Sequence, residues 1–303
     1  MTTNTSLRRT LRRHGQDILL VSPFLALFAA FVAWPVLRSA WLSLTSYHAT
    51  RDPVFVGARN YVELWSDERF WQALGNTLTY MAAVSTLAMA LGLALALAFG
   101  TQSRLHQFAR IVFFLPAVAG GVGAISAWKW MAHSEPYGLF NSLRGLLGLA
   151  PVRFLGDPHW SMVILVAVGV WTVVGYNMII FVAGMRAIPG DLYEAATLDG
   201  AGRWARFLRI TLPLLRPTLA YVLVTGMIAS FQVFYEPYLL YGSVDAVGGP
   251  LDSALMLVTY LFDYGFRQLE LGLASAAAWV LTTMLFGLTW LNMTLTRSAE
   301  GRR

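Results

Sequence analysis

The polar side chains best suited to contact a solute lie inside long apolar stretches of the sequence, where polar groups are costly. Tyr176 and Asn177 lie near the middle of one such stretch, and Asn177 is about 13 Å from its end at Arg186 on helical spacing. A second stretch carries the other candidates, which are Ser230, Gln232, Tyr235 and Glu236. Amides and carboxylates hydrogen-bond hydroxyl groups, and aromatic rings pack against C–H faces. This combination suits a polyhydroxylated solute such as a sugar.

A continuous helix would place Gln232 and Glu236, which are four residues apart, on one face. The neighbouring rings of Phe231 and Phe234 would then surround them. A structural interpretation stays open, in which Asn177 and Gln232 only hydrogen-bond adjacent helices. Glu236 would in that case lie at the membrane interface, beside a proline.

Catalytic and metal-binding chemistry is not indicated. The sequence has no cysteine, and its five histidines are scattered without metal-ligand spacing. The apolar stretches hold no paired carboxylates and no Ser/His/Asp set, so we expect neither catalytic nor metal-binding residues. The one lysine, Lys129, does not follow a glycine-rich turn, so no phosphate-binding loop is present and ATP would have to be used by another chain.

The composition predicts a membrane protein. Hydrophobic residues make up 57% of the chain and charged residues 13%, with a mean hydropathy of +0.57, whereas a soluble domain carries about 25% charged residues. The apolar stretches are continuous rather than alternating, which favours helices over a barrel. We therefore predict an all-α, polytopic protein with six transmembrane helices, at about 18–43, 74–100, 109–131, 160–186, 217–241 and 273–296. Glycines around Gly121 are expected to permit close helix packing.

The arginines predict the orientation. They gather in the N-terminal tail 1–17, the second-to-third connection, the fourth-to-fifth connection and the C-terminal tail 297–303. The positive-inside rule places these segments, and hence both termini, in the cytoplasm. The basic charge of +6 is explained in this way, so we expect no nucleic-acid partner. Residues 18–296 would form one transmembrane domain.

The fourth-to-fifth connection, about 187–216, is unusually long for a loop and is therefore a functional candidate. A proline and a glycine at 189–190 would end the preceding helix. Asp191 would cap a new helix, with Glu194 as its reciprocal partner. Gly200 would take the left-handed conformation that ends this helix.

A second short helix is predicted from about Arg203 to Ile210, stopped by Pro213, and Pro217 would open the fifth span. The whole connection resembles the EAA loop of ABC importer permeases of the carbohydrate-uptake branch. The matching residues are Glu194-Ala195-Ala196, Asp199-Gly200-Ala201, Phe207, Ile210, Leu212-Pro213 and Pro217.

The resemblance extends to maltose- and glycerol-3-phosphate-type permeases over most of the chain. It is carried by four further segments, at 55–61, 70–77, 231–238 and 248–250. It implies the type I importer fold and a multi-pass protein of the bacterial cytoplasmic (inner) membrane. The chain would be one permease of a heterodimer that moves a sugar, a polyol or glycerol phosphate.

The resemblance also implies partners and roles. An ABC ATPase dimer would use ATP and Mg, while this chain would bind no cofactor. An extracytoplasmic solute-binding protein would deliver the cargo, and the lipid bilayer would surround the spans. The residues implied to couple to the ATPase are Glu194, Ala195, Ala196, Asp199, Gly200 and Ala201.

Two alternatives stay open at this point. A permease of the same superfamily that carries a non-sugar solute would share the loop, but in such permeases the matching motif is usually less complete. An ion-coupled secondary transporter would need no ATPase, and inverted repeats would be expected; none is seen in the sequence.

Overall fold

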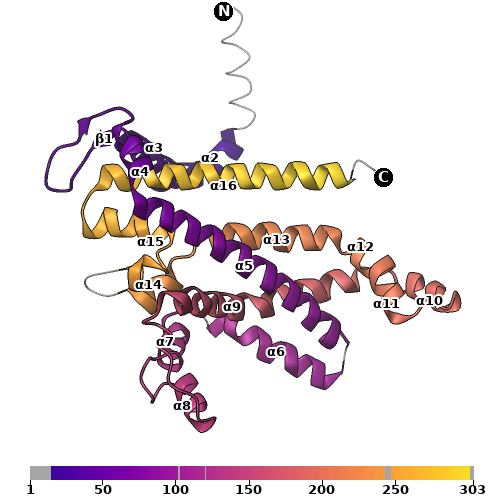
Figure 1. Ribbon diagram of the computed structural model, residues 1–303. Helices are drawn as coiled ribbons and strands as arrows, with labels where there is room; N and C mark the ends of the chain where they lie inside the picture. The colour runs from indigo at the N-terminus through magenta and orange to yellow at the C-terminus, as the bar shows by residue number, and fades with distance from the viewer. Residues whose placement is uncertain (1–14, 102, 120, 243–246, 301–303) are drawn as a thin grey trace, which may run out of the picture. The chain divides into compact units, whose positions relative to one another are not determined.

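The computed structural model describes residues 15–101, 103–119, 121–242 and 247–300, and it is mostly helical (Figure 1). The predicted N-terminal tail lies outside these residues as far as residue 14, and Arg302 and Arg303 lie outside them too. The α-helices are α2 (Gly15–Phe28), α3 (Trp34–Leu42), α4 (Arg59–Ser66), α5 (Glu68–Phe99), α6 (Arg104–Ala119), α7 (Val122–Met131), α8 (Leu139–Leu146), α9 (Pro158–Arg186), α10 (Gly190–Leu198), α11 (Arg203–Arg206), α12 (Leu212–Leu214), α13 (Arg216–Phe231), α14 (Tyr235–Tyr241), α15 (Leu257–Phe262) and α16 (Leu271–Glu300). Shorter π- and 3₁₀-helical turns cover Ala29–Ala33, Phe207–Thr211, Pro250–Asp252 and Asp263–Arg267.

The chain divides into two compact units. The first comprises Met1–Leu64 and Tyr264–Trp279, and the second comprises Trp65–Asp263 and Val280–Arg303. The first unit departs from the all-α prediction, because β1 (Thr45–Ser46) and β2 (Val54–Phe55) pair antiparallel in a short hairpin. A two-residue strand is too short for its alternation to be recognised in the sequence.

Four helical segments are long and apolar enough to cross a membrane: Leu19–Leu42, Glu68–Phe99, Pro158–Arg186 and Leu271–Trp290. Two further segments qualify only as bent pairs of helices, so the structure supports four spans, or up to six if each bent pair crosses once. Side-chain hydrogen bonds at the N-cap mark where two of these helices begin. Asp67 accepts a hydrogen bond of 2.9 Å from the Arg69 amide at the start of α5, and Asp157 accepts one of 2.9 Å from the His159 amide at the start of α9.

The predicted third span, 109–131, is not one straight helix. The axes of α6 and α7 differ by 103°, and Gly121 has φ of 103° at the start of α7. Only glycine adopts this backbone conformation readily. The expectation that this glycine permits close packing was wrong, since a Cβ at Gly121 would meet nothing within 4 Å. Its role is the turn.

The predicted fifth span, 217–241, is also broken. Helix α13 ends at Phe231 and α14 begins at Tyr235, so Gln232 and Glu236 belong to different elements and do not share a helical face. Pro237 explains the break, because proline in a helix interior loses a hydrogen bond and clashes with the carbonyl four residues earlier. Breaking the helix places Pro237 in the first turn of a new one. The bent pair at this end of the chain is instead Arg203–Leu214 with Arg216–Phe231, at 63°.

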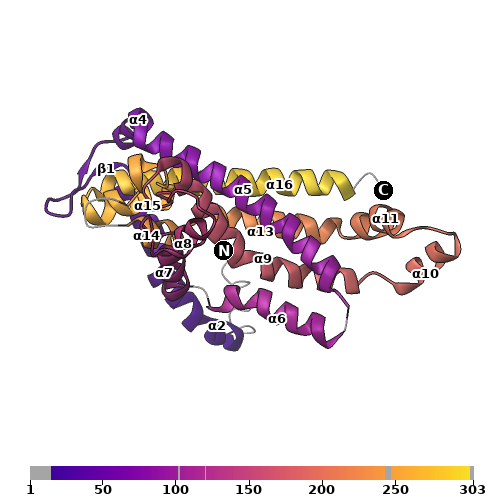
Figure 2. The same ribbon diagram turned by 60° about the horizontal axis from the view of Figure 1, so that its bottom comes forward.

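Three long helices of the second unit, α5, α9 and α13, pack side by side (Figure 2). Glycines set the spacing between them. A Cβ at Gly92 of α5 would lie 2.8 Å from the Asn177 Cβ of α9, and one at Gly169 of α9 would lie 2.3 Å from the Tyr80 hydroxyl of α5. Helix α6 joins them at Gly175 of α9. The small residues therefore bring the backbones together, as expected of helices packed inside a membrane.

Side chains from the start of α5 hold the segment 248–263 in place. The Arg69 guanidinium pairs with Asp252 at 2.7 Å and with Asp263 at 3.2 Å. Gln72 donates to the Leu251 carbonyl at 2.7 Å, and Asn76 donates to the Asp252 carbonyl at 2.9 Å. These bonds fix a turn in which Leu251 and Asp252 have φ of 53° and 54°, a conformation that side chains disfavour.

Candidate functional site

The EAA-like loop forms a compact elbow, residues 190–214, built from α10, α11, the π-turn Phe207–Thr211 and α12 (Figure 1). Helix α10 begins at Gly190 with Pro189 at the N-cap, and no side chain caps it. The predicted capping box was therefore wrong, because Asp191 is already helical. Asp191 still places a negative charge in the first turn, where it suits the helix dipole. The second predicted helix extends past Pro213 and ends at Leu214.

Gly200 ends α10 as predicted. Its φ is 75°, its amide donates to the Thr197 carbonyl at 3.0 Å, and the next amide, of Ala201, donates to the Ala196 carbonyl at 2.8 Å. This pair of bonds is a Schellman motif, which satisfies the last carbonyls of the helix. The chain can then reverse direction within two residues.

Two side-chain contacts join the two arms of the elbow. The Tyr193 and Thr211 hydroxyls are 2.9 Å apart, and the Arg206 guanidinium donates to the Thr197 hydroxyl at 3.0 Å. The coupling candidates lie mostly on the outside: Glu194, Ala195, Asp199 and Gly200 are exposed, while Ala196 and Ala201 are half-buried. The elbow is thus internally braced, with its motif residues accessible.

The elbow also exposes large apolar side chains. Leu198 is 90% exposed and Trp204 is 74% exposed, and Leu192 and Leu208 are exposed as well. Exposed apolar groups rimmed by charge are typical of a protein–protein contact surface. The arrangement therefore fits docking against a partner that supplies an apolar cleft and groups complementary to Glu194 and Asp199.

The six predicted solute-path residues differ in how far they are exposed. Tyr176, Gln232 and Tyr235 are exposed, and Glu236 is half-buried. Asn177 and Ser230 are buried, at 9% and 7% exposure. Asn177 packs where α9 meets Gly92 of α5, so within this chain its surroundings are those of a residue between helices.

Tyr176 has a neighbour that sequence reasoning missed. Its hydroxyl lies close to that of Tyr221 of α13, and the two residues are 46% and 52% exposed. Exposed hydroxyls are unfavourable against lipid, so such a pair in two spans favours a surface facing polar surroundings. Tyr221 follows Pro217 by four residues in an apolar run, and nothing in the sequence pairs it with Tyr176.

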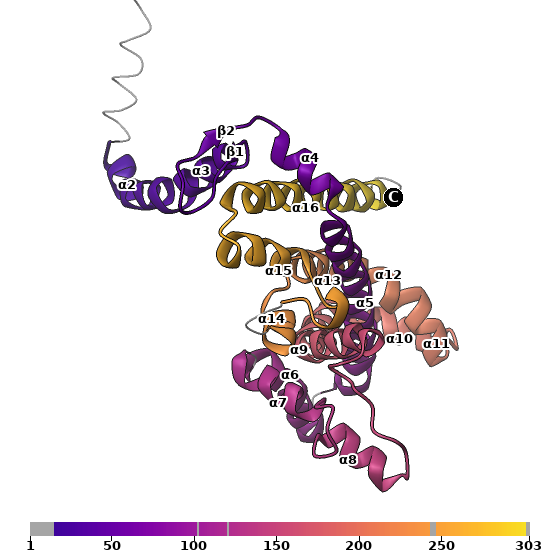
Figure 3. The ribbon, with the colours of Figure 1, turned by 60° about the vertical axis from the view of Figure 1, so that its left-hand side comes forward.

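An aromatic cluster surrounds the start of α14, which lies beside α9 (Figure 3). Phe234 stacks on Tyr238 with ring centroids 5.1 Å apart, and both rings contact Phe262 at 5.2 Å. Phe231, which was expected to take part in the aromatic surround, is 1% exposed and belongs to the core. Tyr235 remains 67% exposed beside the cluster.

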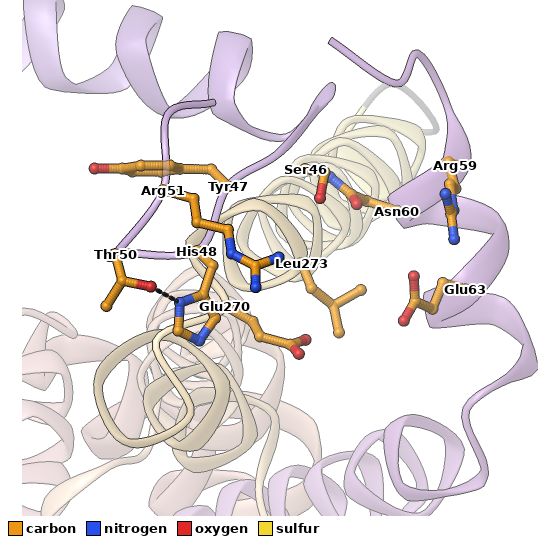
Figure 4. A pocket seen from close by; sticks show the side chains of 10 residues that line it. All are labelled: Ser46, Tyr47, His48, Thr50, Arg51, Arg59, Asn60, Glu63, Glu270 and Leu273. Atoms are coloured by element: carbon orange, nitrogen blue, oxygen red, sulfur yellow. Dashed lines mark hydrogen bonds between the residues drawn. The ribbon is translucent and has the colours of Figure 1, made fainter. Parts of the chain in front are cut away.

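The first unit holds an open polar cavity of about 390 Å³ that none of the predicted sites includes (Figure 4). Its lining carries both signs of charge, including Arg51, Arg59 and Glu270. Asn60 shapes one wall by donating to the carbonyls of Ser43 at 2.9 Å and Thr45 at 2.8 Å. In the sequence, two residues of this lining belong to the segment 55–61, which was singled out only for its resemblance to other permeases.

Comparison with known proteins decides the family. Residues 7–298 match the family described as binding-protein-dependent transport system inner membrane component. The chain belongs to this family. Family members among curated proteins include the lactose transport system permease protein LacF of Rhizobium radiobacter, 32% identical over 99% of both chains. The trehalose/maltose transport system permease protein MalF of Thermococcus litoralis is 31% identical over 94% of both chains.

A solved structure agrees with the family assignment. A chain of a bacterial ABC transporter involved in the import of the acidic polysaccharide alginate matches with a TM-score of 0.83 at 24% identity, covering 97% of this chain and 99% of that one. This likeness shows that the chain has the fold of an ABC importer permease.

Proposed function

We propose that this chain is one of two permease subunits of an ATP-driven importer for an oligosaccharide or a related polyol. The family match carries the permease assignment. The sugar class is supported by the names of LacF and MalF, which are similar to this chain over nearly their whole length. The exposed tyrosines and Gln232 add groups that bind sugar hydroxyls and rings.

The elbow would be the mechanical contact with a separate ATPase. Its motif residues are exposed, its two arms are braced, and Leu198 is left uncovered by this chain. ATP binding and hydrolysis in the ATPase would move α10, and the following helices would carry that movement to the solute path. In this arrangement ATP and Mg act only in the partner.

The second permease would cover surfaces that this chain leaves open. No described residue of the span Leu19–Leu42 is buried within its own compact unit. Such a helix needs another protein or lipid around it. With six spans and both termini in the cytoplasm, the polar cavity of Figure 4 would face outward, toward a solute-binding protein.

The assembled complex tests this function. This chain, its partner permease, the ATPase and the binding protein should be placed in proteoliposomes and assayed for uptake of a panel of labelled oligosaccharides, amino acids and peptides. We expect accumulation of an oligosaccharide that requires both ATP and the binding protein. Uptake driven by a sodium or proton gradient without ATP would contradict the importer assignment. Accumulation of amino acids or peptides alone would contradict the sugar class.

Tyr176 and Tyr221 are expected to contact the passing solute. Replacing Tyr176 by alanine removes a ring and a hydroxyl, a loss of about 1.4 kcal/mol or a tenfold rise in the solute concentration for half-maximal uptake. Tyr176→Phe should recover part of the loss, because it keeps the ring. Tyr137→Ala, which changes an exposed tyrosine outside the apolar spans, serves as the control. If Tyr176→Ala and Tyr137→Ala behave alike, Tyr176 does not line the path.

A further inference from the structure

A groove between α6 and α9 lies at the end of the span that carries Arg186, apart from the elbow motif and the solute-path residues. It has a volume of about 380 Å³. Each helix lines it with residues spaced i, i+3, i+4 and i+7, so one face of each helix forms one wall. The lining is Gln107, Arg110, Ile111 and Phe114 on α6, and Ile179, Val182, Ala183 and Arg186 on α9.

The two helices approach closely beside the groove, at Gly175. A Cβ at Gly175 would lie 1.9 Å from the Phe113 carbonyl oxygen, so the backbones meet there. The groove opens from this crossing toward the end of α9. Its lining residues run from Ile179 to Arg186 on α9 and from Phe114 back to Gln107 on α6.

The lining combines apolar and cationic side chains. Arg110 and Arg186 are its two charged residues, and Ile111, Phe114, Ile179, Val182 and Ala183 are apolar. Neither α6 nor α9 contains an acidic residue. Within the described parts of the chain, neither Arg110 nor Arg186 has an ion-pair partner, and one terminal nitrogen of Arg110 is buried without a hydrogen bond.

A buried guanidinium nitrogen without a partner is costly, and a phosphate oxygen is the acceptor that arginine binds best. The adjoining walls are apolar, and Ile111 is 65% exposed at the mouth of the groove. The remaining outer face of α6 is also apolar, with Leu115 58% and Val118 69% exposed. An occupant must therefore join an anionic phosphate to a hydrocarbon chain.

We infer that this groove binds an anionic phospholipid, with its phosphate at Arg110 and Arg186 and an acyl chain between α6 and α9. Basic pockets between membrane helices near the surface are suited to such headgroups. A lipid held here would pack against the helix that leads directly into the elbow, since α10 begins four residues after Arg186. The bound lipid would then be part of the structure that carries movement from the elbow.

The test uses the assembled transporter in phosphatidylcholine nanodiscs that contain a minority of phosphatidylglycerol, with bound lipid measured by native mass spectrometry. We expect the wild type to retain phosphatidylglycerol in preference to phosphatidylcholine. Each of Arg110→Gln and Arg186→Gln should lower that preference about fivefold, and both together about 25-fold. Arg110→Lys should keep most of it.

Arg104→Gln is the matched control, because it removes the same charge from the same end of α6 but does not line the groove. It should change the preference by less than about twofold, which is less than half of the free-energy effect expected for an arginine that contacts the lipid. Ala183→Phe should displace the lipid by filling the groove without altering charge. An effect of Arg104→Gln equal to that of Arg110→Gln would overturn the inference in favour of diffuse attraction.

The chain has no native cysteine, so Ile111→Cys provides a single attachment point. With a thiol-reactive benzophenone attached there, we expect illumination to cross-link the chain to phosphatidylglycerol, and glycerol phosphate in solution should not compete. Cross-linking to the second permease instead would show that protein covers the groove. Competition by glycerol phosphate would show a site for a free phosphate. Either outcome would overturn the lipid assignment.

Discussion

Replacing Gly200 by proline is expected to abolish ATP-driven uptake while the chain still inserts and assembles its spans. Gly200 has φ of 75°, whereas proline is fixed near −65°. Proline also lacks the amide hydrogen that Gly200 donates to the Thr197 carbonyl. The Schellman turn would be lost, and α10 would no longer present its motif residues in the braced geometry. Uptake into proteoliposomes, compared with ATP hydrolysis by the same complex, measures the uncoupling.

Two variants separate this effect from a general disturbance of the elbow. Gly202 has φ of −66° and ψ of 169°, which proline tolerates, and a Cβ there meets nothing within 4 Å. Gly202→Pro should therefore keep most of the uptake. Gly200→Asn should also keep most of it, because asparagine tolerates the left-handed conformation. Equal loss in Gly200→Pro and Gly202→Pro would show that rigidity of the loop, and not the turn at Gly200, is what matters.

Gly175→Ala is expected to destabilise the protein by about 3 kcal/mol, the upper end of the usual cost of overpacking. The new methyl would lie 1.9 Å from the Phe113 carbonyl oxygen and 2.9 Å from the Phe114 Cα. Both are backbone atoms, so no rotamer change relieves the clash and α6 must move away from α9. The loss of stability can be measured by heating the purified complex and recording how much monodisperse protein remains at each temperature.

Gly123→Ala is the matched control for this prediction. Gly123 is also helical, but a Cβ there meets nothing within 4 Å. Alanine is the better helix former by up to about 1 kcal/mol, so Gly123→Ala should leave the unfolding temperature unchanged or raise it. The same glycine-to-alanine change would thus lower stability at Gly175 and leave it unchanged or raise it at Gly123. A stabilised Gly175→Ala would be incompatible with the close contact between α6 and α9.

Features that are set by residues close together in the chain could be predicted from the sequence. The turn at Gly200 and the start of α13 beside Pro217 each depend on neighbouring residues, and both were predicted. Continuous apolar runs likewise indicate spans because hydrocarbon requires a satisfied backbone. The family resemblance rests on the same local motif, and the match over residues 7–298 confirms it.

Hydropathy alone did not reveal the breaks within the third and fifth predicted spans. Gly121 and Pro237 lie inside stretches that are apolar enough overall to be predicted as single spans. Contacts between distant elements were equally hidden. Tyr221 pairs with Tyr176 across 45 positions of sequence, and Arg69 pairs with Asp252 across 183. Such pairs become visible only once the helices are assembled.

The gap between α13 and α14 affects a main-chain oxygen that proline leaves without its usual donor. The carbonyl of Val233 would normally accept from residue 237, but that residue is proline and has no amide hydrogen. At membrane depth such an oxygen is tolerated only inside protein or next to water, and Val233 is only 7% exposed, so the chain itself shields this part of the backbone from lipid. Because the acceptor belongs to the backbone, no change of side chain at Val233 removes it. A permease adapted to another cargo would retain it for as long as position 237 remains proline.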